Sequence, residues 1–130
     1  RIGYGIAKPD IISKIRRVQG NAFPVSVLSL HAALASYKDT DFIEFSRVNN
    51  AKSRSYLYGV LEKLGFFHIP SYTNFVLFKS EIDSIKFVKE IRKRKVVIRP
   101  FYSNGENWIR VSMGTLSEMN KLKDALEDIT

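Results

Sequence analysis

The sequence has 130 residues, of which 45% are hydrophobic and 12% aromatic, as in an ordinary globular domain. It has no cysteine, which excludes disulfides and thiolate metal sites, and its two histidines, His31 and His68, have no helix-spaced acidic partner. We therefore expect no metal site. A formal net charge of +8 is compatible with nucleic acid, an anionic surface or an anionic small molecule as a partner, and equally with a solvated basic helix face. No run of about 18 apolar residues is present, so we expect no membrane partner.

The N-terminal third is predicted to contain one strand and two helices. Residues 1–7 are strand-like and begin at Arg1 rather than methionine, so we expect this sequence to be part of a longer chain. Pro9 is typical of a first helical turn and predicts a helix over residues 10–18. Residues 25–37 are apolar almost all round, which predicts a helix buried at a domain or subunit contact.

The middle of the chain is predicted to form a long helix and two strands. The helix covers residues 39–64 and is ended by Gly65. Residues 66–69 are extended, and residues 74–78 form an apolar strand that we expect to be covered on both faces. An amphipathic helix follows over residues 82–94. Its predicted buried stripe consists of Ile82, Ile85, Val88 and Ile91.

The C-terminal part is predicted to add two strands, over residues 96–101 and 107–113, and a last helix. Thr115 begins that helix, and Glu118 three residues later completes a capping box. The buried stripe of this helix is predicted to be Leu116, Met119, Leu122, Leu126 and Ile129. The expected fold class is α+β, with a small antiparallel sheet and helices packed on one of its faces.

The pair Asn104-Gly105 is the strongest turn signal in the sequence, because a type I′ turn needs positive φ at both central residues. Counting outward from this turn pairs Tyr102 with Asn107, and then Arg99 with Arg110. Directly opposed residues of an antiparallel pair lie on the same face. Both arginines are therefore predicted to project from the face that points away from the helices.

Two opposed arginines repel each other by roughly 0.2–1 kcal/mol in a sheet. An anion bound between Arg99 and Arg110 would cancel this repulsion through forked hydrogen bonds, with phosphate or carboxylate as the natural guest. The alternative is two exposed arginines in a hairpin of another register. The remaining excess charge is interpreted as a solvated helix face, formed by Lys86, Lys89, Arg92, Lys93, Arg94 and Lys95.

Five segments resemble type I pyridoxal-phosphate (PLP) aminotransferases, in the family's order. Arg1-Ile2-Gly3-Tyr4-Gly5-Ile6-Ala7 resembles the segment after the lysine that binds PLP, and residues 28–35 resemble the interdomain helix. Residues 74–78, 97–101 and 107–115 resemble the small domain of the histidinol-phosphate aminotransferase branch. The resemblance implies that residues 1–37 belong to the large PLP-binding domain and the interdomain region, and that residues 38–130 form the C-terminal small domain.

The resemblance also implies roles for three residues. Arg1 would bind the cofactor through its phosphate, Arg110 would bind the anionic end of the substrate, and Arg99 would help to hold the substrate phosphate. No catalytic residue is expected within this sequence, because the family's imine-forming lysine would precede Arg1. The sequence by itself is therefore expected to be inactive and to form no imine with PLP.

The function implied by the resemblance is transfer of an amino group between histidinol phosphate, or a related phosphorylated amino compound, and 2-oxoglutarate or glutamate. A cytoplasmic enzyme that is a homodimer when intact is expected. Alternatives within the fold are another aminotransferase or an amino-acid-phosphate decarboxylase. An alternative of another class is a non-catalytic module that binds an anion or nucleic acid, although no recognised nucleic-acid motif supports nucleic-acid binding.

Overall fold

The computed structural model describes residues 2–19 and 25–129. Its helices and strands are α1 (Pro9–Gln19), α2 (Val27–Lys38), α3 (Thr40–Lys63), β1 (His68–Ile69), β2 (Phe75–Lys79), α4 (Ser84–Lys93), β3 (Arg99–Ser103), β4 (Glu106–Ser112) and α5 (Leu116–Glu127). The chain divides into two units, Arg1–Glu44 and Phe45–Thr130. Among the described residues, no helix is long and apolar enough to cross a membrane.

The described residues of the first unit form helices but no buried core. The first helix, α1, confirms the predicted helix over residues 10–18. The strand predicted over residues 1–7 is wrong where the structure describes it, because residues 2–7 form a loop. A strand needs a neighbour for its backbone hydrogen bonds, and no described segment pairs with these residues.

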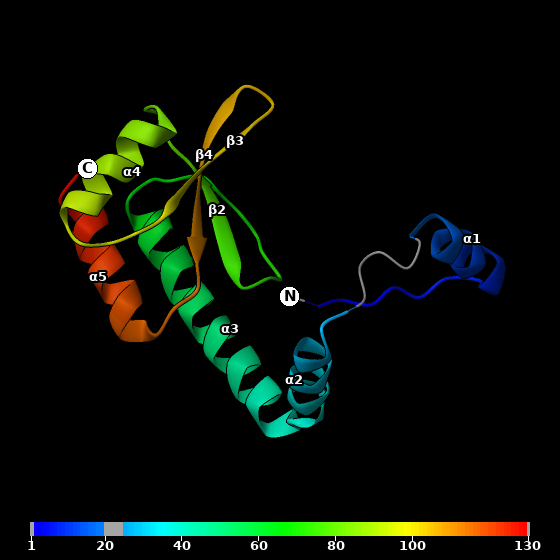
Figure 1. The fold of residues 1–130 in the computed structure, drawn as a ribbon. Coiled ribbons are helices and arrows are strands. Elements are labelled where there is room, and N and C mark those ends of the chain that lie inside the picture. The colour runs from blue at the N-terminus through cyan, green and yellow to red at the C-terminus, as the bar shows by residue number, and fades with distance from the viewer. Residues whose placement is uncertain (1, 20–24, 130) are drawn as a thin grey trace. The chain divides into compact units, whose positions relative to one another are not determined.

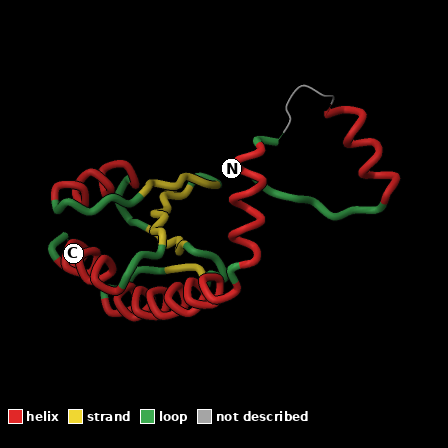
Figure 2. Tube along the Cα trace, turned by 60° about the horizontal axis from the view of Figure 1, so that its bottom comes forward, coloured by secondary structure: helices red, strands yellow, loops and turns green. Residues whose placement is uncertain are grey.

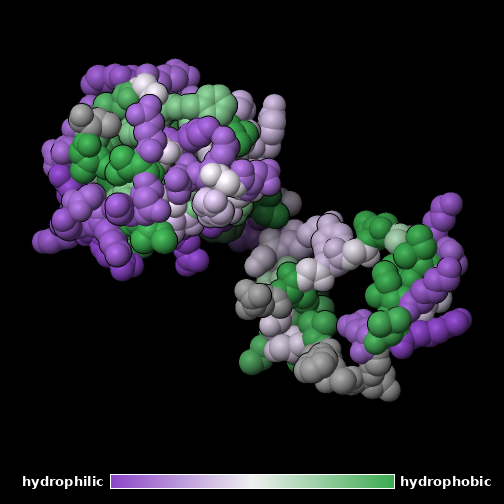
Figure 3. Space-filling view, turned by 90° about the horizontal axis from the view of Figure 1, so that it is seen from above, coloured by the Kyte–Doolittle hydropathy of each residue, from purple (hydrophilic) through white to green (hydrophobic). Residues whose placement is uncertain are grey.

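Helix α2 lies where a helix was predicted but is not buried. Leu28 is 82% exposed and Leu34 is 49% exposed, and hydrophobic side chains of α1 and α2 are open at the surface in Figure 3. The prediction of a buried helix is therefore wrong for the chain as described. The physical reason is that no described residue of this unit is buried, so no core exists for α2 to pack against. Contact with another domain or subunit stays a prediction.

The second unit is built on a four-stranded antiparallel sheet with the order β1-β2-β4-β3 (Figure 1). Helices α4 and α5 and the later part of α3 line one side of this sheet, as a second view also shows (Figure 2). The strands alternate accordingly: Val76 and Phe78 of β2, and Ile109 and Val111 of β4, are buried on the helix side. This arrangement confirms the predicted α+β class.

One hydrophobic core joins the three helices to the sheet. Its buried members are Leu57, Val60, Leu61, Val76, Phe78, Phe87, Ile91, Ile98, Ile109, Val111, Leu122, Ala125 and Leu126. A buried polar contact adds to it, because the Ser53 hydroxyl in α3 donates a hydrogen bond of 2.7 Å to the carbonyl oxygen of Gly114. The turn between β4 and α5 is thereby tied to the long helix.

The buried stripe predicted for α4 is confirmed at Ile91 and in part at Val88, which packs against the core, but it is wrong at Ile82 and Ile85. The buried residues of α4 are Ser84, Phe87 and Ile91, whereas Ile82 and Ile85 are 52% and 55% exposed. Asp83 caps the helix by accepting a hydrogen bond from the Lys86 backbone N–H, so Ile82 precedes the helix. Phe87 packs against two other core rings, Phe66 and Phe78. That aromatic contact sets the rotation of the helix.

The predicted capping box at the start of α5 is confirmed. The Thr115 hydroxyl accepts a hydrogen bond from the Glu118 backbone N–H, and the Glu118 carboxylate accepts one of 2.7 Å from the Thr115 backbone N–H. Gly114 makes this possible, because a Cβ there would lie 2.6 Å from Glu118 Oε2. Met119, Leu122 and Leu126 are buried as predicted, but Leu116 is 48% exposed because it lies in the first turn of α5.

The capping box makes stability depend on pH. Hydrogen bonds from the Thr115 backbone N–H and then the Thr115 hydroxyl lower the pKa of Glu118 below its ordinary value of 4.5. A carboxyl with a lowered folded-state pKa contributes stability above its unfolded pKa and loses it as pH falls through the folded value. We expect the stability difference between the unmodified chain and Glu118→Gln to shrink from pH 7 to pH 3. Urea unfolding of both proteins across this range tests it; a constant difference would contradict it.

Candidate functional site

The hairpin between β3 and β4 has the predicted turn. Asn104 and Gly105 have φ values of 52° and 79°, the left-handed conformation that a type I′ turn requires at both positions. The strands pair as expected, with Tyr102 opposite Asn107. Both the turn and its register are therefore confirmed.

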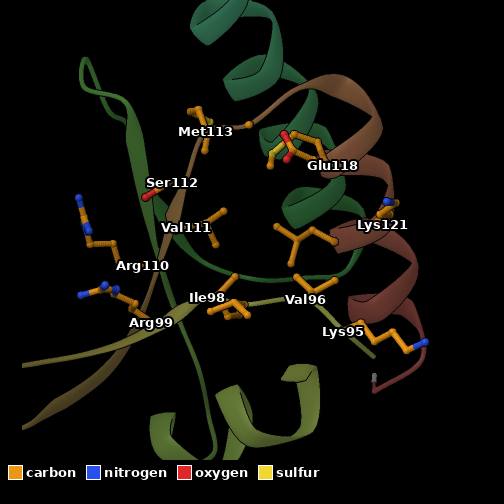
Figure 4. Close-up of a pocket in the computed structure, with 14 residues that line it drawn as sticks. Lys95, Val96, Ile98, Arg99, Arg110, Val111, Ser112, Met113, Glu118 and Lys121 are labelled. Carbon is orange, nitrogen blue, oxygen red and sulfur yellow. The ribbon is translucent and has the colours of Figure 1, made fainter. Parts of the chain in front are cut away.

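Arg99 and Arg110 are directly opposed across the hairpin. Figure 4 shows both side chains pointing to one side, while Val111, the next residue along β4, points to the other. Arg99 is exposed and Arg110 is partly buried. We call these two residues the arginine pair, and the side of the sheet away from the helices the open face.

No described carboxylate neutralises the arginine pair. The one acidic residue of the hairpin sequence, Glu106, is already engaged: its Oε1 lies 2.6 Å from the Lys79 Nζ. The hydrogen bond from Lys79 also lowers the pKa of Glu106. Across the described residues, the arginine pair is therefore free to bind an external anion.

Arg110 is held by an aromatic ring. Its guanidinium carbon lies 4.1 Å from the centroid of the Phe75 ring. The register explains this contact: Leu77 of β2 is directly opposite Arg110, and Phe75 is directly opposite Ser112, which makes Phe75 a diagonal neighbour of Arg110. Phe75 was not singled out from the sequence.

The attraction between the Phe75 ring and Arg110 is similar in free energy to the repulsion between the two arginines. Two opposed like charges cost roughly 0.2–1 kcal/mol. A cation over an aromatic ring gains about 0.5–1 kcal/mol when exposed and about 2 kcal/mol when desolvated. Because these magnitudes are similar, the Phe75 ring can offset the repulsion that Arg110 experiences from Arg99.

The strand β2 is less covered than predicted. Phe75 and Leu77 are only partly buried, whereas Val76 and Phe78 are fully buried. The expectation that both faces would be covered is wrong, because all helices of the second unit lie on one side of the sheet. The open face of β2 is therefore available for the contact with Arg110.

A pocket of about 540 Å³ has both members of the arginine pair among its lining residues. The rest of its lining includes residues of the helix side, among them Ile98, Val111, Met119 and Leu122. Figure 4 shows the two guanidinium groups pointing away from it. An anion held by these guanidinium ends would therefore lie on the open face.

The described residues do not by themselves form a PLP site. That cofactor needs an amine to form an imine and groups that hold its phosphate. Among the described strand residues on the open face, the one lysine is Lys79, and its amine forms an ion pair with Glu106. Arg1, predicted to contact the cofactor phosphate, lies outside the described residues. Among the described residues, the arginine pair therefore fits an anionic group. In the described part of the chain, no acidic or histidine cluster could hold a metal ion.

A comparison with known protein families shows to which family this chain belongs. The profile of the family described as "Aminotransferase class I and II" matches residues 1–127. The chain belongs to this family. The family match agrees with the resemblance found in the sequence motifs, and it covers both units of the chain.

The similar curated relatives are longer proteins. The histidinol-phosphate aminotransferase of Methanothermobacter thermautotrophicus is 35% identical over 136 residues, which cover 99% of this chain and 36% of the relative. That of Symbiobacterium thermophilum is 30% identical over 128 residues, or 98% of this chain and 35% of the relative. The chain thus spans about a third of the length of these relatives.

Solved structures have the same fold. One assigned as a histidinol-phosphate aminotransferase, from Erwinia carotovora atroseptica, has a TM-score of 0.70 and 33% identity, covering 75% of this chain and 28% of that chain. Aspartate aminotransferase of Thermotoga maritima has a TM-score of 0.75 at 19% identity, covering 95% of this chain and 34% of that one. The fold of this chain is therefore that of type I aminotransferases.

Proposed function

We propose that the chain is the anion-binding part of a PLP-dependent aminotransferase that acts on histidinol phosphate or a related phosphorylated amino compound. The amino group would be exchanged with 2-oxoglutarate and glutamate. The observation that carries this proposal is the arginine pair: two opposed guanidinium groups on an open sheet face with no described carboxylate between them. The names of the relatives support the choice of substrate.

The arginine pair would hold the phosphate end of the substrate. Arg110 would bind the anion through a fork of N–H donors, and Arg99 would add a second set from the opposite strand. Fixing one end of the substrate on a rigid hairpin orients the amine at the other end, which lowers the entropic part of the barrier. Specificity would follow from the geometry of this pair, because an uncharged substrate leaves both arginines without a partner.

The roles of the other residues and domains are proposed from the similarity to the aminotransferase family. Arg1 would bind the cofactor phosphate, and residues 1–37 would belong with the cofactor-binding domain while residues 38–130 form the small domain. When bound, PLP would supply the electron sink for the reaction. A histidinol-phosphate aminotransferase of Sinorhizobium meliloti has been solved with pyridoxal-5'-phosphate, at 24% identity to this chain and a TM-score of 0.66. The intact enzyme is proposed to be a cytoplasmic homodimer.

The test is an assay of the full-length protein that carries this chain. Incubation with histidinol phosphate, 2-oxoglutarate and PLP is expected to yield glutamate. Histidinol without its phosphate is the matched control substrate, and its kcat/KM is expected to be lower by about 100-fold or more because the arginine pair is left unpaired. Release of CO2 from an amino-acid phosphate without glutamate formation would instead indicate a decarboxylase. Equal turnover of the two histidinol substrates would contradict the anion site.

A further inference from the structure

We infer that Phe75 is a positioning residue for Arg110, and that its ring, acting through the guanidinium, determines how tightly the enzyme holds an anionic substrate. This inference rests on the proposed function and deepens it. Nothing in the turn signal or in the charge pattern of the hairpin points to Phe75. The contact exists because β2 pairs with β4 in the observed register.

The geometry leaves the hydrogen-bond donors of Arg110 free. The guanidinium carbon lies 4.1 Å from the ring centroid, so the ring attracts the cation without accepting a hydrogen bond from it. A guanidinium has N–H donors arranged in a plane as a fork. Among the described residues Arg110 forms no ion pair, so the donors are available to a phosphate or carboxylate.

The backbone at Phe75 is anchored independently of its side chain. Its carbonyl oxygen accepts hydrogen bonds of 2.5 Å from the Ser71 hydroxyl and 3.1 Å from the Thr73 hydroxyl. The Ser71 backbone N–H in turn donates to the Tyr58 hydroxyl of α3 at 2.6 Å. Because these bonds use the backbone of Phe75, a changed side chain leaves them in place. The ring is therefore presented from a fixed position.

The ring also gives the two arginines different roles. Arg99 is exposed and has no aromatic partner among the described residues, whereas Arg110 is partly buried and stacked on Phe75. A held guanidinium loses less conformational freedom when it binds an anion. Arg110 is thus the preorganised member of the pair, and Phe75 is the cause.

The experiment measures anion affinity directly. Inorganic phosphate is titrated by calorimetry into the full-length protein with PLP bound, so that the cofactor phosphate site is already filled. Phe75→Leu is expected to raise the Kd for phosphate by about three- to tenfold, since it removes the attraction between cation and ring. Phe75→Tyr keeps a ring and is expected to stay within about twofold of the unmodified protein. Phe75→Met replaces the ring with a flexible side chain and gives the same comparison should the leucine variant not fold.

Two further readouts separate positioning from a structural role. In turnover with a phosphorylated substrate, Phe75→Leu is expected to raise KM with kcat nearly unchanged, because the lost interaction is the same in the ground state and the transition state. On an Arg110→Gln background, Phe75→Leu is expected to have no further effect on the Kd for phosphate. An equal additional loss on that background would overturn the inference.

The outcomes distinguish this inference from the proposed function. A Kd for phosphate that is the same in the unmodified protein and the variants without a ring overturns the role of Phe75, whether or not the protein transaminates. A Kd that rises without the ring, in a protein that does not transaminate, leaves the inference standing and removes the proposed reaction.

Discussion

Replacing Arg110 with alanine in the full-length enzyme is expected to lower kcat/KM for a phosphorylated amino substrate by about 30-fold or more. Truncating one partner of a hydrogen-bonded charge pair costs about 2–5 kcal/mol, and about 1.4 kcal/mol corresponds to a factor of ten. Steady-state kinetics with histidinol phosphate would measure the loss. The expected cause is that the substrate phosphate loses the forked donors of the arginine that the Phe75 ring holds in place.

Arg99→Ala is expected to have a smaller effect than Arg110→Ala. Arg99 is exposed and unstacked, so more of its interaction energy is lost in ordering the side chain. Arg92→Ala is the matched control, because Arg92 is an exposed arginine in the last turn of α4. Unchanged kinetics in both Arg99→Ala and Arg110→Ala would show that the arginine pair does not bind the substrate.

The largest loss of stability is expected from Phe78→Ala. Phe78 is 0% exposed, and its ring packs 5.1 Å from that of Phe66 and 5.7 Å from that of Phe87. A buried Phe→Ala change typically costs about 3–5 kcal/mol, out of a total stability of about 5–15 kcal/mol for a domain. Urea unfolding of the chain, followed by circular dichroism, would measure the decrease in the free energy of unfolding.

Phe67→Ala is the matched control for the core prediction. Phe67 is 65% exposed, and the centroid of its ring lies 6.1 Å from that of the Trp108 ring. Its removal is expected to cost less than about 1 kcal/mol. Equal losses for the two alanine variants would mean that the core is not centred on Phe78.

Short-range sequence signals correctly predicted the hairpin and the position of Arg99 opposite Arg110. Asn104-Gly105 determines the turn, the turn determines the register of β3 against β4, and the register places Arg99 opposite Arg110. The capping box of Thr115 and Glu118 was predictable for the same reason. In both cases the interacting residues are close in sequence, so backbone geometry alone relates them.

Contacts between distant segments could not be predicted in this way. Strands β2 and β4 are separated by α4 and by β3, and no tight turn determines their register. The position of Phe75 beside Arg110 was therefore not visible in the sequence. The rotation of α4 was missed because exposed Ile82 and Ile85 are as apolar as buried Ile91, and only packing against Phe66 and Phe78 distinguishes them.

For this protein, the order of residues by itself determined the helices, the hairpin and the presence of two facing arginines, because each depends on neighbours a few positions apart. Only the tertiary structure decided which face of the sheet stays open and which ring supports Arg110. The physical reason is that these contacts join segments far apart in the sequence, so they depend on how the helices and β2 pack and not on local backbone geometry.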